Sequence, residues 1–463
     1  MRFAVSKSPP VIVSPSSTEL APAPGKAKLA QVQLSSWDRS YVGFQVTTLL
    51  LFDGPVNQPV EAVKKGLSRA LVHYAPIAGR LATDDEEISL SIACTSEGVP
   101  FVAATADCAM ADHGGLLDGA PFSAGLLDDL AVYYHPVARR TDPLLLMQVT
   151  EFACGGFAVG VTWNHTLADG DGMAQFLQDV GNLARADEAA VSAPLRDGGA
   201  VSLPLLSPPV VAAKQWLMLN RGGMGLAYLD ITIPATLINR IKSEYKAAHA
   251  ADGGYCTTFE AGVAVLWRCR TRAIIGDNYD PTATAPLAFF VNVRKHVRAV
   301  AGYYGNCAVA QVAFATAGEV VGGDIAGVID LIKGAKDGVP DLLNAMHGGR
   351  GVEGVGEMGE EEMAAVFGYN ALMVTSWRNI AFDRVDFGGG VPARVVGRWQ
   401  QSTIPGCMAF LSCRATADAG ERMLTQCVRE EHAAAFLDEL HRLAAADGRV
   451  GLVSVGMNYV TSK

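Results

Sequence analysis

The stretch WNHTLADGDG, residues 163–172, joins two patterns of different periodicity. The residues before it, FAVGVTWNH, have the β-branched and aromatic character of a strand. In residues 173–184, apolar side chains recur at helical spacing. Gly170 and Gly172 suit a sharp bend of the backbone between the two. The stretch is therefore predicted to be a strand–loop–helix junction, with His165 at the end of the strand.

His165 is followed four residues later by Asp169, and this spacing permits three interpretations. On a helix the two side chains would share one face, as in a metal site. The glycines favour a turn instead, and no third ligand stands at a suitable spacing, so we predict no metal site. Two interpretations remain open, because the motif alone is frequent by chance. One is a structural histidine, and the other is a general base in a loop fixed by Asp169.

Strand and helix patterns continue on both sides of this junction. A strand pattern ends near residue 52, a helix pattern follows from Pro59 to Tyr74, and residues 144–165 form a hairpin around a Gly-Gly turn. Periodicity weakens between residues 187 and 225, where prolines and glycines gather, and strands and helices then resume. The pattern predicts an α/β fold of mixed sheet with two domains, at residues 1–190 and 226–463, joined by a linker at 191–225.

Composition excludes several classes of protein. The chain has 463 residues and a formal net charge of -10, which does not suit a nucleic-acid partner. Its 9 cysteines contain no C-x-x-C pair, so no disulfide or zinc framework is expected. Prolines interrupt the apolar region that a signal peptide would need near the N-terminus. The apolar runs elsewhere are too short to cross a bilayer. We expect a cytoplasmic protein without a membrane partner.

Two further motifs fail the tests of their own context. The segment GRGVEG, residues 349–354, fits the dinucleotide-binding pattern, but it follows a helix-like run where that pattern requires a strand. The segment DGDG, residues 169–172, resembles the start of a calcium loop, but Met173 stands where the next oxygen ligand belongs. No G-x-S-x-G is present, so the signature of a serine hydrolase is lacking.

Seven motifs along the chain, including HTLADG itself, give the junction its context. In chain order they are LSSWD (34–38), YAPIAGRL (74–81), HTLADG (165–170), VNVRK (291–295) before GYYGN (302–306), TSW (375–377) and DFGGG (386–390). This ordered series resembles the plant BAHD acyltransferases, which transfer an acyl group from coenzyme A to an alcohol or an amine. The resemblance spans essentially the whole chain, and several ordered motifs are far more specific than one H-x-x-x-D.

The resemblance implies a fold and a mechanism. It implies two domains of the chloramphenicol-acetyltransferase type, with sheets flanked by helices and a channel at their interface. His165 would be the general base for direct attack of the acceptor on the thioester, so no acyl-enzyme forms. Asp169, with Gly170, would hold the loop and point away from the channel. Acyl-CoA would be a co-substrate, with no resident cofactor, and we expect a monomer.

The resemblance also assigns residues in the second half. Asp386 and Arg294 would form a structural ion pair. The sequence departs from the family where Gly389 replaces the usual tryptophan, so local packing there must differ. Thr375 and Trp377 would help to bind the acceptor and the tetrahedral intermediate. For Trp377, an ordinary place in the core is the alternative.

The acceptor is the least determined part. Relatives that use shikimate carry an arginine upstream of T-x-W, whereas residues 358–374 hold no Lys or Arg and include glutamates at 360–362. We therefore predict transfer of a hydroxycinnamoyl group to an amine, such as a polyamine or arylamine, which would make a phenolamide. The alternatives are a neutral alcohol or a shikimate-type acceptor, or a catalytically silent homologue that binds acyl-CoA. For coenzyme binding, Arg240 and Lys242 are candidates, and a solvated helix face is the alternative.

Overall fold

The structure is a computed structural model of the chain. The structure describes residues 4–16, 30–83, 90–112, 116–117, 128–135, 137–196, 199–219, 224–276, 280–347, 368–398, 404–445 and 455–458. The GRGVEG segment and the three glutamates at 360–362 lie outside these residues. No helix in the described part of the chain is long and apolar enough to cross a membrane.

The first sheet contains seven strands, ordered β1-β7-β8-β9-β4-β14, with β2 also paired to β7. Its strands are β1 (Val5–Lys7), β2 (Val11–Val13), β4 (Gln45–Phe52), β7 (Val99–Ala106), β8 (Leu145–Phe152), β9 (Phe157–Asn164) and β14 (Arg394–Arg398). The predicted hairpin is β8 and β9, which pair antiparallel. Every residue of β9 is buried, which explains its continuous apolar and small-residue sequence.

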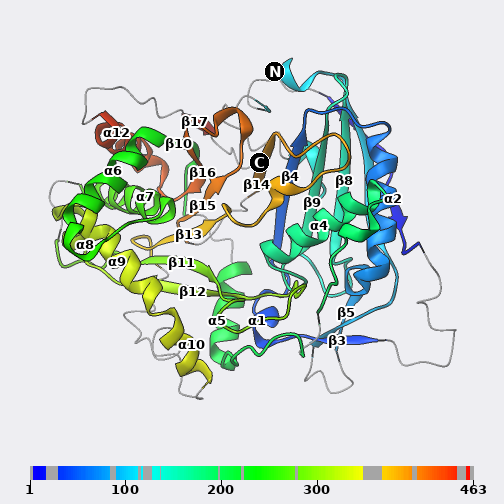
Figure 1. The fold of residues 1–463 in the computed structure, drawn as a ribbon, viewed down its shortest axis with the longest axis horizontal. Coiled ribbons are helices and arrows are strands. Elements are labelled where there is room, and N and C mark those ends of the chain that lie inside the picture. Colours follow the sequence, from blue (N-terminus) through cyan, green and yellow to red (C-terminus); the bar gives the residue numbers. More distant parts are fainter. Residues whose placement is uncertain are drawn as a thin grey trace.

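Two long helices, α2 (Pro59–His73) and α4 (Gly170–Ala184), pack together, and α2 contacts β8. Figure 1 shows α2 at the outer edge of this half. The helix predicted from Pro59 is α2, and its buried residues include Val63, Leu67 and Leu71 at helical spacing. A three-stranded sheet of β3 (Gln31–Gln33), β6 (Leu90–Ala93) and β5 (Arg80–Thr83) adds to this half. Short 3-10 turns include η2 (Ala75–Ala78) and η3 (Met110–Asp112).

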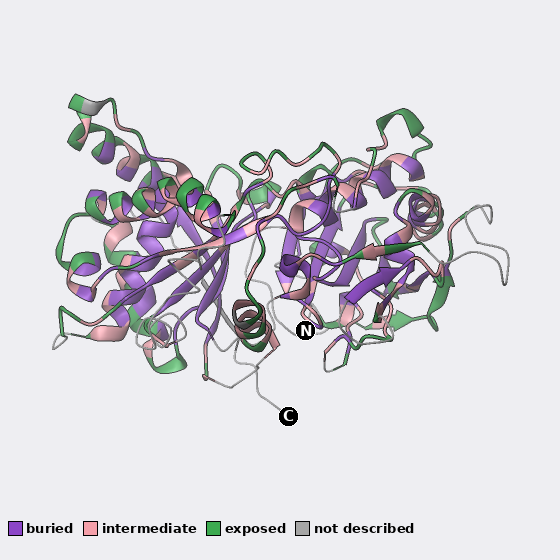
Figure 2. Ribbon diagram, turned by 90° about the horizontal axis from the view of Figure 1, so that it is seen from below, coloured by how far each residue is buried: buried purple, intermediate pink, exposed green. Residues whose placement is uncertain are grey.

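The second sheet also contains seven strands, ordered β12-β11-β13-β15-β16-β10-β17. Its strands are β10 (Tyr228–Pro234), β11 (Leu287–Asn292), β12 (Ala308–Ala313), β13 (Leu372–Ser376), β15 (Gly406–Leu411), β16 (Gly420–Gln426) and β17 (Val455–Asn458). Its helices are α6 (Ala235–Ala248), α7 (Thr258–Ile275), α8 (Ala317–Gly322), α9 (Ile325–Asp337), α10 (Val339–His347) and α12 (Glu430–Ala445). Figure 2 shows the two halves side by side, each with a buried interior.

Two elements tie the halves together. Strand β14 comes from the second half of the sequence but pairs antiparallel with β4, with Val396 opposite Leu49. Figure 1 shows it beside β4. The segment predicted as a linker contains α5 (Pro208–Leu219), which packs on α1 (Ser36–Arg39). The boundary expected at residue 226 therefore does not separate the two sheets, because residues 394–398 belong to the first. The fold itself is the expected α/β arrangement of two mixed sheets flanked by helices.

Candidate active site

His165 directly follows β9, at the end of a strand as predicted. Its backbone N–H donates to the carbonyl of Phe44 at 2.7 Å, and its own carbonyl accepts from Asn306 Nδ2 at 2.9 Å. The ring stacks on Tyr41, with 4.1 Å between ring centroids. Its Nδ1 atom is buried and has no hydrogen-bond partner of ordinary geometry among the described residues. These contacts fix the backbone and one face of the ring.

The electrostatic surroundings keep the His165 imidazole unprotonated. Burial is the largest cause, and it lowers the pKa of His165 to about 4. The Asp169 carboxylate opposes this shift, while the Lys214 ammonium adds to it. The half-buried ring is therefore neutral at physiological pH, which is the form that accepts a proton.

Asp169 borders the cavity, but both of its carboxylate oxygens are engaged. Its Oδ1 accepts from the N–H of Gly172 at 3.0 Å and so caps the start of α4. Arg294 donates to both oxygens, at 2.8 and 2.9 Å, and the N–H of Cys307 donates to Oδ2 at 3.0 Å. Since Arg294 and Cys307 belong to the second half, this buried carboxylate connects the His165 loop of the first half to the second half.

The predicted ion pair between Asp386 and Arg294 is wrong. Arg294 pairs with Asp169, and the carboxylate of Asp386 faces Arg185 at 3.8 Å. Asp386 also accepts from the N–H groups of Gly388 and Gly390, so it shapes its own turn. The physical reason is burial. Asp169 lies almost entirely out of solvent and offers oxygens in bidentate geometry, whereas the Asp386 side chain is 31% exposed.

Gly172 is needed for close packing between two backbone segments, in addition to the bend predicted from the sequence. A Cβ atom at this position would lie 1.9 Å from the carbonyl oxygen of Tyr304. The start of α4 therefore approaches the backbone of the GYYGN segment so closely that only glycine fits. Gly170 is less constrained, because its nearest neighbour is the side chain of Ile380. The two glycines of DGDG thus allow the two halves to come together at the loop.

Three buried polar residues at this junction were not predicted. Asp38, at the end of LSSWD, accepts from Arg196 Nη2 at 3.0 Å and from Asn306 Nδ2 at 2.9 Å. Arg196 also donates to the carbonyls of Leu167 and Thr166 in the His165 loop. Both LSSWD and GYYGN are visible in the sequence, but their meeting at one loop is a long-range contact that spacing does not indicate.

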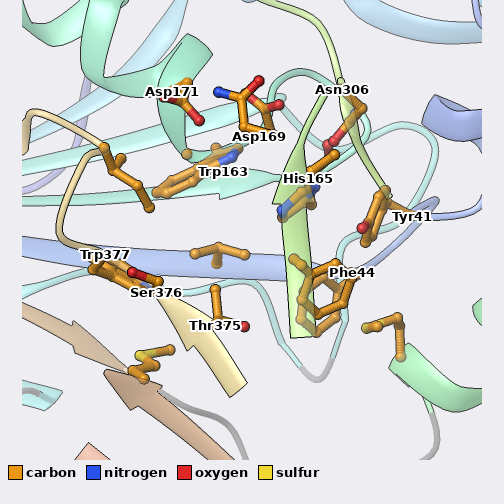
Figure 3. A pocket seen from close by; sticks show the side chains of 18 of the residues that line it. Tyr41, Phe44, Trp163, His165, Asp169, Asp171, Asn306, Thr375, Ser376 and Trp377 are labelled. Carbon is orange, nitrogen blue, oxygen red and sulfur yellow. The ribbon is translucent and has the colours of Figure 1, made fainter. Parts of the chain in front are cut away.

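A cavity of about 290 Å³ opens at His165 and is lined by both halves. Figure 3 shows His165 beside Tyr41 on one side and Trp377 with Ser376 on another. The described lining residues are mostly apolar or aromatic; they include Phe44, Trp163, Leu217, Met218, Phe290, Met373, Ile380, Phe382 and Met408. Such a lining suits an apolar acyl group or acceptor.

Thr375 and Trp377, predicted to bind the acceptor, both line this cavity. Thr375 lies on β13 and is half-buried. Trp377 is only 9% exposed, and its ring packs on Phe382 with 5.5 Å between centroids. Trp377 therefore also has the core position that was its alternative.

Two charged residues of the cavity wall were not predicted. Arg398, at the end of β14, pairs with Asp128 at 2.6 Å and lies over the ring of Tyr133 at 4.0 Å. Asp171 lies 3.7 Å from Arg294. Burial, with the neighbouring Asp169, raises its pKa to about 6, and Arg294 opposes that shift. The lining thus carries one basic and one acidic group beyond the His165 loop.

The remaining predicted residues lie elsewhere. Arg240 and Lys242 are on α6 and do not line the cavity. Arg240 faces Glu244 at 3.9 Å and bonds the carbonyl of Leu443, so its role in coenzyme binding stays a prediction. Gly389, at the family's tryptophan position, packs on the backbone of residues 54–55, where a Cβ would meet the Gly54 oxygen at 2.9 Å. A tryptophan would not fit without moving that loop.

Within the described residues, no three His, Cys, Asp or Glu side chains gather in a way that could hold a metal ion. The model of the Transferase family matches residues 13–442. Acyl transferase 15 of Oryza sativa subsp. japonica is 37% identical over 459 residues, covering 96% of this chain and 100% of the relative.

A myricetin 3-O-glucosyl 1,2-rhamnoside 6'-O-caffeoyltransferase of Crocosmia x crocosmiiflora is 30% identical and covers 95% of this chain and 99% of its own. Among solved structures, vinorine synthase superposes with a TM-score of 0.71 at 19% identity, covering 95% of this chain and 98% of its own. A protein of F. graminearum complexed with coenzyme A and T-2 mycotoxin has a TM-score of 0.66 at 16% identity, covering 92% and 99% of the two chains.

Proposed function

Because the chain belongs to the Transferase family of plant BAHD acyltransferases, which use acyl-CoA, we propose that it transfers an aromatic acyl group to a hydroxyl group of a neutral acceptor. The observation that carries this proposal is the neutral imidazole of His165, which faces a largely apolar cavity between the two halves. The aromatic acyl group is supported by the caffeoyl group that names the Crocosmia relatives, and these names also specify an oxygen acceptor.

The proposed reaction is a direct displacement. The acceptor oxygen attacks the thioester carbonyl carbon while Nε2 of His165 takes the hydroxyl proton. The carbonyl π electrons move to oxygen, and the resulting tetrahedral intermediate collapses with cleavage of the carbon–sulfur bond. The departing thiolate receives the proton from the imidazolium, which leaves free coenzyme A, an ester and neutral His165. Thr375 and Trp377, on another wall of the cavity, are the proposed contacts of the acceptor and intermediate.

The charges of the cavity wall favour a neutral acceptor. The guanidinium of Arg398 is already opposed by Asp128, and the carboxylate of Asp169 by Arg294, so neither presents a net charge. An anionic acceptor would find no unopposed cation among the described lining residues, and shikimate is accordingly not proposed. The predicted amine acceptor remains a second candidate because of Asp171. Its carboxylate lines the cavity at 3.7 Å from Arg294 and would pair with an ammonium group.

A grid of acyl-CoAs against acceptors tests the proposal. Caffeoyl-CoA, p-coumaroyl-CoA and acetyl-CoA would be combined with neutral alcohols and glycosides, polyamines, arylamines and shikimate, with products identified by mass. We expect aromatic esters, which mild alkali cleaves back to the acid. Amides, which resist that treatment, would establish the second candidate instead. Best turnover with acetyl-CoA or with shikimate would contradict the proposed acyl group or the proposed acceptor, respectively.

A further inference from the structure

A lysine contacts the tyrosine on which the His165 ring stacks. The Lys214 Nζ atom of helix α5 is 3.9 Å from the centroid of the Tyr41 ring, and the His165 ring stacks on the same tyrosine at 4.1 Å. Tyr41 thus contacts both the ammonium group and the imidazole ring. The ammonium therefore lies no more than about 8 Å from the centre of the imidazole ring.

The position of α5 makes this contact a defined one. Lys214, Leu217 and Met218 follow the i, i+3, i+4 spacing of one helix face, and the latter two line the cavity. The neighbouring Gln215 donates to the carbonyl of Arg39 at 2.5 Å, which anchors α5 on the turn that carries Tyr41. The helix therefore holds the lysine against the tyrosine while its own apolar side chains form a wall of the cavity.

Lys214 has no carboxylate at ion-pair distance among the described residues. Asp38 is the acidic group that acts on it, but Asp38 is already bonded to Arg196 and Asn306. Burial lowers the pKa of Lys214 to about 7. An apolar side chain of similar length would fill this place without the cost of desolvating a charge, so packing alone does not explain a lysine here.

We propose that Lys214 is a positioning residue that acts on His165 through the Tyr41 ring. The cation holds the ring by a cation–π contact, the ring holds the imidazole by stacking, and the positive charge disfavours protonation of the imidazole. The stack takes the place of the hydrogen bond to Nδ1 that often orients a catalytic histidine, because Nδ1 has no such partner among the described residues. This inference rests on the proposed role of His165 as the general base.

The other charged groups around His165 each lie beside a group of opposite charge. Asp169 is neutralised by Arg294, and Asp38 by Arg196. Asp171 shares Arg294, and Tyr41 stays uncharged because burial raises its pKa. Lys214 is thus the cation near His165 that lacks a paired carboxylate in the described structure. Removing it should raise the pKa of His165 by about 1.5 pH units, as expected for a charge about 8 Å away at an effective dielectric constant of about 20.

The test needs no substrate. Protein with isotope-labelled histidine would be titrated between pH 5 and 8 by NMR, with the His165 signal assigned by its loss in His165→Gln. At pH 5 we expect about a tenth of the imidazole to be protonated in the wild type, and about three quarters in Lys214→Met. Lys214→Arg keeps the charge and should titrate like the wild type. Lys333→Met is the matched control, because Lys333 lies 5.6 Å over the Tyr245 ring, outside the cavity lining.

Kinetics then separate positioning from stability. With an accepted substrate pair, Lys214→Met should move the acid limb of kcat/KM upward by the same interval, and Tyr41→Leu should lower kcat more than it raises KM. If Lys214→Met does not fold, Lys214→Gln replaces it, since it also removes the charge. An unchanged His165 titration in the folded charge-free variant would overturn the inference, whatever substrate the enzyme uses. An absence of turnover in the wild type would instead overturn the proposed function.

Discussion

The largest loss of stability is expected from removal of the Asp169 carboxylate, because this group accepts four hydrogen bonds from three residues around the His165 loop. Asp169→Ala would leave the guanidinium of Arg294 without its bidentate partner, the first turn of α4 without its cap, and the N–H of Cys307 without an acceptor. Breaking a buried ion pair typically costs about 3–5 kcal/mol, and losing a helix cap costs about 1 kcal/mol. These losses overlap, so we expect a destabilisation of about 4 kcal/mol.

The assay is urea-induced unfolding followed by tryptophan fluorescence, with Asp386→Ala as the matched control. The Asp386 and Arg185 side chains are 31% and 28% exposed and lie 3.8 Å apart, so the control should lose about 1 kcal/mol or less. Asp169→Asn keeps an oxygen for Gly172 but loses the charge, and should fall between the two. The expectation would be contradicted if Asp386→Ala lost as much unfolding free energy as Asp169→Ala, or if Asp169→Ala lost less than about 1 kcal/mol.

Three further variants follow from the structure. Trp377→Ala should cost about 3–5 kcal/mol in urea unfolding, because the ring is 9% exposed and packed on Phe382, while Trp377→Phe should cost clearly less; equal effects would contradict the core assignment. Gly172→Ala should lower both thermal stability and turnover, since its methyl group would overlap the backbone of Tyr304, and a neutral effect would show that the approach is not required. Between pH 6.5 and about 4 the wild type should lose stability relative to His165→Gln, because unfolding exposes an imidazole that binds a proton the folded ring does not; parallel pH profiles would contradict the lowered pKa.

Local sequence patterns predicted the elements around His165 well. The residues before it are buried on both faces and β-rich, and those after it repeat at helical spacing, so β9 and α4 were visible in the sequence. Strand β14 was missed for a physical reason. It has only five residues, and its partner β4 lies more than 300 residues earlier in the chain, so no turn signal connects the two. Helix α5 was hidden by the prolines at its start.

The site could be predicted only in part, because its polar contacts are long-range. His165 could be identified from its motif. The partner of Arg294 depended on which of two aspartates the fold buries, and the resemblance to the family indicated Asp386 where the structure has Asp169. Arg398 enters the cavity through β14, so it could not be placed without that strand. Lys214 lay in the segment of weak periodicity that was predicted to be a linker.

His165 is proposed to transfer the proton during direct acyl transfer in the cavity between the halves. The most direct test of this role is the turnover of His165→Ala, measured with an acyl-CoA and an acceptor that the wild type uses, in protein shown to be folded. We expect a loss of about 10²- to 10⁴-fold in kcat. Turnover within a few-fold of the wild type would contradict it.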